Sequence, residues 1–234
     1  MALTQVRPEG LGFVNGRRNL IINGAMQVAQ RGTSSTGQTG GGYKTCDRFQ
    51  FGIGGIGTYT ITQSTDAPDG FGNSLKVDCT TADASPTGSD RLFVSSIIEG
   101  QDVQHLKKGT SAAEQLTLSF WVKSNKTGVG NVNLRDADNT RMVGGTYTIN
   151  TANTWEYKTI VIEGDTAGSG INNDNGNGIT FEWNLIAGST YNTAGAQDIW
   201  VTGGGTRASG QTANCGTSGA TWQITGVQLE VGDT

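Results

Sequence analysis

The sequence has 234 residues, a formal net charge of -4, a pI near 5.0 and 15% charged residues. This balance argues against a nucleic-acid-binding protein, because phosphate binding requires a basic patch and a local pair such as Arg17-Arg18 is too small to form one. No apolar run approaches the roughly 18 residues that span a bilayer, so membrane insertion is not expected. Glycine accounts for 37 residues, roughly twice ordinary usage, which is typical of a chain of short strands and turns.

The N-terminus indicates a protein that is made in the cytoplasm, and the cysteines indicate neither a metal site nor a disulfide framework. Residues 1–5 lack a charged region followed by an apolar core, so no signal peptide is expected. Cys46, Cys79 and Cys215 are odd in number and far apart, and His105 is the only histidine. We therefore expect neither a zinc site nor a disulfide framework, and Cys79, which alternates with apolar residues, is interpreted as a buried free thiol.

In chain order, residues 1 to about 18 have little apolar periodicity, which predicts an extended N-terminal arm. From Asn19 onward, alternating apolar runs separated by turn residues predict roughly eleven strands, with a long polar loop at 30–42 and another at 163–178. A helical turn or two is expected within 101–107. The expected strands cover 19–24 (continued by Met26 and Val28), 49–53, 58–62, 75–79, 91–98, 115–123, 132–134, 146–149, 155–161, 179–187, 199–202 and 221–231.

The clearest strand is Gln115–Lys123, in which Leu118 and Phe120 fall on one face and Trp121 on the other. Many short strands with almost no helix, repeat or linker predict an all-β, jelly-roll-like β-sandwich over 19–234, preceded by the arm 1–18. The expected core residues are Leu118, Phe120, Trp155, Phe181, Trp183 and Leu229, with Trp121 and Trp222 also placed in the core.

No catalytic residue is predicted. A Ser-His-Asp site needs a histidine with a nucleophile nearby, and His105 has none, while the spacing of the acidic residues does not pair two carboxylates across a sugar. The loop 172–178 has oxygen donors that suit calcium, but it lacks the carboxylate pattern of an EF-hand. Asx-rich turns held by their own side chains explain that loop more simply, so we expect no metal and no cofactor.

Two sets of residues are candidates for binding. Flat aromatic side chains stack on sugar rings, and Tyr43, Tyr191 and Trp200 lie in or beside long polar loops, which makes them candidate glycan platforms. A free arm of this kind is either simply disordered or docked on a partner protein, and this arm offers scattered apolar and basic residues that suit docking. These candidate anchoring residues are Leu3, Val6, Leu11, Phe13, Val14, Arg17 and Arg18.

The two ends of the chain carry a resemblance to a known family. Residues 19–33 (NLIINGAMQVAQRGT), followed by Asp47-Arg48-Phe49, resemble the start of a domain common in bacteriophage tail fibre proteins, and residues 224–233 (ITGVQLEVGD) are similar to its final strand. Residues 72–77, 98–100 and 118–123 match between them in order. Such domains are jelly-roll sandwiches similar to carbohydrate-binding modules. Their relatives often carry Asn-Gly-Asp-Phe-Glu at the opening strand, near a structural calcium. This chain has Asn23-Gly24-Ala25-Met26-Gln27 there, so both acidic side chains are missing and the calcium does not carry over with the resemblance.

The resemblance implies a structural virion protein rather than an enzyme. We expect a tail fibre or adhesin that attaches by its arm to other virion proteins (a tail adaptor or portal-proximal protein) and contacts host cell-surface polysaccharide with its head. A homotrimer is expected, because fibres of this kind are threefold and exposed sheet edges need covering. The alternatives are a capsid-attached fibre or decoration protein with the same fold, and a glycan depolymerase.

Overall fold

The computed structural model describes residues 19–85, 87–192, 198–203, 210–212 and 215–232. The arm 1–18 lies outside these residues, so its role and the boundary at residue 18 stay predictions. All the candidate anchoring residues belong to this arm and also lie outside the described residues: Leu3, Val6, Leu11, Phe13, Val14, Arg17 and Arg18.

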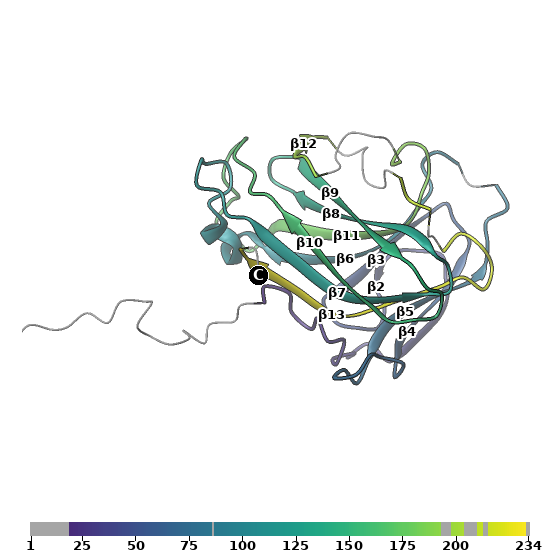
Figure 1. The fold of residues 1–234 in the computed structure, drawn as a ribbon. Helices are drawn as coiled ribbons and strands as arrows, with labels where there is room; N and C mark the ends of the chain where they lie inside the picture. The colour runs from purple at the N-terminus through teal and green to yellow at the C-terminus, as the bar shows by residue number, and fades with distance from the viewer. Residues whose placement is uncertain (1–18, 86, 193–197, 204–209, 213–214, 233–234) are drawn as a thin grey trace, which may run out of the picture.

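The described chain is a β-sandwich of two antiparallel sheets (Figure 1). One sheet has six strands in the order β1-β4-β5-β13-β7-β10, and the other has seven in the order β12-β9-β8-β11-β6-β3-β2. The predicted fold class is therefore confirmed for these residues. The bounds are β1 Ser34–Gln38, β2 Gly42–Tyr43, β3 Phe49–Gly54, β4 Thr58–Ser64, β5 Ser74–Thr81, β6 Arg91–Glu99, the 3-10 helix η2 Gly100–Leu106, β7 Leu116–Ser124, β8 Gly128–Asp136, β9 Arg141–Ile149, β10 Glu156–Ile162, β11 Asn177–Ala187, β12 Val201–Thr202 and β13 Thr221–Val231.

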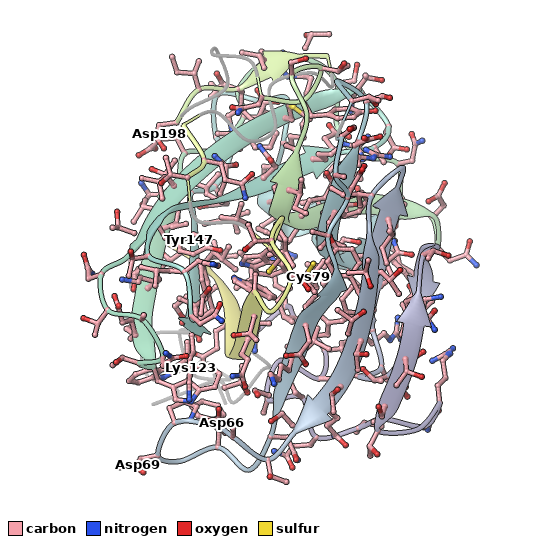
Figure 2. The ribbon with its side chains drawn as sticks, turned by 90° about the vertical axis from the view of Figure 1, so that its right-hand side faces the viewer. Asp66, Asp69, Cys79, Lys123, Tyr147 and Asp198 are labelled. Carbon is pink, nitrogen blue, oxygen red and sulfur yellow. The ribbon has the colours of Figure 1, made fainter. Side chains whose placement is uncertain are left out.

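The core lies between the sheets and is built by the alternating apolar positions of the long strands. Phe120 on β7 is fully buried and meets Trp183 of β11 edge-on, with ring centroids 5.8 Å apart. Tyr147 of β9 makes a second edge-on contact with Phe120 at 5.2 Å, and Figure 2 shows its place in the interior. The predicted core residues that are buried are Leu118, Phe120, Phe181, Trp183, Trp222 and Leu229.

Two tryptophans do not belong to this core. Trp155 is only half-buried, because it precedes β10 and its indole donates a hydrogen bond to Asp66 at the surface. Its assignment to the core is wrong. Trp121 is half-buried too, since it occupies the side of β7 that faces away from Phe120.

The segment 19–24 is not a strand, contrary to the prediction. The side chain of Asn19 accepts hydrogen bonds from the amides of Ile21 and Leu229, and residues 22–25 form a turn in which Asn23 has a φ of 61°. Asn side chains that bind backbone groups compete with the strand ladder, which explains the turn.

The expected loop 30–42 contains most of two strands. β1 pairs with β4, and β2 pairs with β3, so each forms the edge of its sheet. Both strands are half-buried or exposed throughout, and for this reason β1 carries Ser, Thr and Gln instead of alternating apolar residues. Because an edge strand with no buried face needs no alternating apolar residues, the sequence pattern does not reveal β1 and β2 as strands.

The three cysteines are free and buried, at 1% exposure each. Burial raises the pKa of the Cys46 thiol to about 12 and also raises the pKa values of Cys79 and Cys215. The interpretation of Cys79 as a buried free thiol is confirmed. Among the described residues, no helix is long and apolar enough to cross a bilayer.

Candidate functional site

The structure separates two of the three predicted aromatic platforms. Tyr43 lies on β2 with 41% of its surface exposed, and the Arg31 guanidinium sits 5.2 Å from its ring centroid. Trp200 precedes β12, at the opposite edge of the same sheet. Its indole nitrogen donates a hydrogen bond to the carbonyl of Glu163 at 2.7 Å, and the side chain packs against the core. Trp200 therefore does not join a platform with Tyr43.

Tyr191 belongs to the outward face of the seven-stranded sheet, near the start of β6. The Arg91 guanidinium lies 4.9 Å from the ring centroid of Tyr191 and 4.9 Å from that of Phe93. A cation held between two aromatic faces is stabilised by both ring quadrupoles. The Phe93 ring lies over Gly52 of β3, where an added Cβ would come within 2.0 Å of its Cζ atom. A side chain at that position would require the Phe93 ring to move.

A line of polar side chains crosses the same face. In the strand register Gln50 lies opposite Ser95, Ser95 opposite Glu182, and Glu182 opposite Asn133. These four residues, which we call the polar row, point away from the core because their strand neighbours, such as Phe181 and Trp183, point into it. Tyr43 lies opposite Gln50 and extends the row to the sheet edge.

The floor of the polar row is buried. Ser95 and Asn133 are 0% exposed and Glu182 is 2% exposed. Arg135 donates a hydrogen bond to Glu182 Oε1 at 2.9 Å, and the Asn184 amide donates one to Asn133 Oδ1 at 2.6 Å. The hydrogen bonds from Arg135 and Asn184 fix the orientations of the Glu182 and Asn133 side chains.

Two polar atoms of the row have no hydrogen-bond partner among the described residues, namely Ser95 Oγ and Asn133 Nδ2. Leaving a buried polar group unsatisfied costs about 1–3 kcal/mol, and most buried polar atoms in folded proteins are paired. A hydroxyl can donate and accept, whereas the amide nitrogen can only donate. Both groups suit a ligand rich in hydroxyls, which would reach them only once the groups that close them off from solvent move aside.

Sequence reasoning missed the polar row. Its signal is present, because Glu182 alternates with Phe181 and Trp183 in the longest apolar run. Asn133 alternates in the same way on β8. What the sequence does not give is the register that sets these residues opposite one another.

The described residues hold no group of three or more His, Cys, Asp or Glu side chains that could bind a metal ion. The site is therefore described by hydrogen bonds, stacked rings and the ion pair of Arg135 with Glu182 at 2.9 Å.

The sequence matches no family of known proteins and no curated protein. Several solved structures resemble the fold. The enzymatically active domain of bacteriophage CBA120 tailspike protein 4 has a TM-score of 0.47 at 14% identity over 92% of this chain, which spans 21% of the tailspike chain. A carbohydrate-binding module, CBM4, has a TM-score of 0.45 at 12% identity, over 91% of this chain and 99% of its own. TmCBM61, solved with β-1,4-galactotriose, has a TM-score of 0.37 at 10% identity, over 92% and 99%.

Proposed function

We propose that the protein is a carbohydrate-binding head that holds glycan on the outward face of its seven-stranded sheet. The observation that carries this proposal is the polar row, in which Ser95 Oγ and Asn133 Nδ2 are buried without a partner among the described residues. Sugar hydroxyls both donate and accept hydrogen bonds, so they match these groups. Tyr43 extends the row at the sheet edge, and the Arg91–Tyr191 pair lies on the same face, four residues along β6 from Ser95. Both offer ring faces for the apolar side of a sugar.

The replacement Ser95→Ala should separate binding from stability. We expect affinity for glycan to fall about 3- to 10-fold, the equivalent of one net hydrogen bond, while the melting temperature stays the same or rises. The rise follows from removing a buried hydroxyl that has no partner among the described residues. A microarray of bacterial surface glycans selects the ligand, and calorimetric titration and thermal melting then measure both effects. Ser96→Ala is the matched control, since Ser96 is the next residue and is buried on the core side of β6.

The outcomes distinguish a wrongly assigned binding site from a wrongly assigned carbohydrate-binding role. If the array gives a ligand but Ser95→Ala and Tyr43→Ala bind it as tightly as the native protein, glycan binds elsewhere on the molecule. If no glycan on the array binds, the carbohydrate-binding role itself is wrong. Because Tyr43 is 41% exposed, its replacement leaves the fold intact.

We further propose that this head belongs to a virion fibre, which binds host polysaccharide without cleaving it. The support is the resemblance of residues 19–33 and 224–233 to tail fibre domains, together with the meeting of these two segments in space. The amide of Leu20 donates a hydrogen bond to the carbonyl of Leu229 at 2.9 Å, and that of Val227 to Gly24 at 3.0 Å. The described chain thus begins beside β13 (Figure 1).

In this proposal residues 1–18 join other virion proteins, and the fibre is a homotrimer. Immunogold labelling of purified particles with an antibody to the full chain should mark the tail. Labelling of the capsid would favour a capsid-attached fibre, and unlabelled particles would contradict the virion role. New reducing ends released from the selected glycan would show a depolymerase instead.

A further inference from the structure

The outward face of the six-stranded sheet carries a row of rings. Trp121 on β7 lies opposite Tyr157 on β10, with ring centroids 5.5 Å apart and an interplanar angle of 52°. Phe71, from the loop between β4 and β5, continues the row across β13. It meets Trp121 above Gly226, where an added Cβ would lie 2.6 Å from Phe71 Cζ and 3.1 Å from Trp121 Cδ1. We call Phe71, Trp121 and Tyr157 the aromatic strip.

A hydrogen-bonded group of polar side chains centred on Asp66 borders this strip on the side of Trp155. Asp66 accepts hydrogen bonds from Lys123 Nζ at 2.7 Å, Trp155 Nε1 at 3.1 Å and Gln223 Nε2 at 3.2 Å. Figure 2 shows Lys123 and Asp66 together at one end of the molecule. Burial raises the pKa of Asp66, but the hydrogen bonds from Lys123, Trp155 and Gln223 outweigh it and hold the pKa below its ordinary value. The carboxylate is therefore charged and its donors stay ordered.

The cations of this face are already neutralised. Lys76 and Lys123 are the lysines at outward positions of β5 and β7, and each is ion-paired, with Asp78 at 2.8 Å and with Asp66 at 2.7 Å. An anionic ligand would find no free positive charge on either lysine. The face instead offers ring surface and hydrogen-bonding groups to an uncharged molecule.

We propose that the aromatic strip is a second glycan-binding surface, which takes a neutral, linear polysaccharide. Ring faces in a line suit successive sugar units, and the framed amide and carboxylate groups suit their hydroxyls. The strip shares no residue with the polar row and lies on the other sheet, so either site can exist without the other.

Affinity electrophoresis of the full chain in native gels tests this inference. The probes are three neutral polysaccharides (barley β-glucan, galactomannan and dextran) and one anionic polysaccharide (alginate). We expect retardation in at least one neutral gel and an apparent Kd that rises about 3- to 10-fold in Tyr157→Ala. Tyr157→Phe keeps the ring and should bind normally. Val161→Ala is the matched control, because Val161 is 47% exposed on the same face of β10, outside the strip.

Several results would overturn the inference. They are migration unaffected by every neutral polysaccharide, retardation by alginate alone, and equal retardation of Tyr157→Ala and the native chain. A fourth is an oligomer in light scattering that Tyr157→Ala dissociates, which would make the strip an interface between copies. Ser95→Ala in the same gels distinguishes the two sites. If only Ser95→Ala weakens retardation, the aromatic strip fails while the polar row stands. If only Tyr157→Ala weakens it, these polysaccharides bind the aromatic strip, and the polar row is judged by the array-selected glycan.

Discussion

Replacing Phe120 with alanine is expected to lower the free energy of unfolding by about 3–5 kcal/mol, because the change empties the centre of a close-packed core. Phe120 is 0% exposed and makes edge-on ring contacts with Tyr147 and Trp183, at 5.2 and 5.8 Å between centroids. Phe120 belongs to the six-stranded sheet and both rings that it meets belong to the seven-stranded sheet, so the cavity lies between the two layers of the sandwich. Neither layer can collapse into it without moving a whole strand.

Urea-induced unfolding, followed by tryptophan fluorescence, measures this effect. Val161→Ala on β10 provides the baseline, since Val161 is 47% exposed and its loss should cost less than about 1 kcal/mol. A loss of similar size in Phe120→Ala and Val161→Ala would mean that Phe120 is not at the centre of the core.

Removing Asp165 is the second change with a large expected effect. Arg141 donates to both of its carboxylate oxygens, at 2.6 and 2.8 Å, and Lys108 Nζ lies 3.3 Å from it and 2.6 Å from Asp136. The side chains of Lys108, Asp136 and Asp165 are all buried. Taking one partner from a buried ion pair costs about 3–5 kcal/mol, so we expect Asp165→Ala to destabilise the fold by that amount at neutral pH.

The same network makes the free energy of unfolding depend on pH in the acidic range. Burial raises the pKa of Asp165, but hydrogen bonds from Arg141 and the Ala167 amide, with the charge of Lys108, outweigh it and lower the pKa below 3.8. Because the folded-state pKa is depressed, the contribution is complete above about pH 4 and is lost as the pH falls through the folded-state value. The difference between the native protein and Asp165→Ala should therefore shrink in acid.

Denaturant unfolding of both proteins from pH 7 to pH 3 follows this difference. Arg31→Ala breaks the surface pair with Asp47, in which the Arg31 side chain is 52% exposed, and should cost less than about 1 kcal/mol throughout. A difference for Asp165→Ala that stays constant on acidification would show that the carboxylate charge does not stabilise the fold.

The period-2 patterns predict much of this fold. The strand expected at 221–231 is β13 to the residue, and the alternation in Gln115–Lys123 identifies the buried face of β7. The prediction fails where side chains bind backbone, as Asn19 does, and at β1, whose polar residues at a sheet edge have no buried face to mark it. Alternation also does not tell which face of a strand an aromatic ring prefers, so Trp121 and Trp155 were assigned to the core.

The candidate site was predicted only in part. Tyr43 and Tyr191 lie on the outward face that carries the polar row, whereas Trp200 is held at the far edge of the sheet. The polar row joins four strands that are distant in sequence, and its members meet only through their register. Each of them alone reads as an ordinary outward polar residue, because the unpaired state of Ser95 Oγ and Asn133 Nδ2 exists only in the folded chain.

The most direct test of the central claim is nuclear magnetic resonance on the isotope-labelled full chain, titrated with an oligosaccharide of the glycan that the array selects. We predict that the side-chain amide signal of Asn133 shifts first, together with the backbone amides of Ser95 and Glu182, because the ligand supplies the missing partner of Asn133 Nδ2. Shifts at all three that saturate with the calorimetric affinity would place glycan on the polar row. A saturating titration that leaves the Asn133 amide unchanged would contradict it.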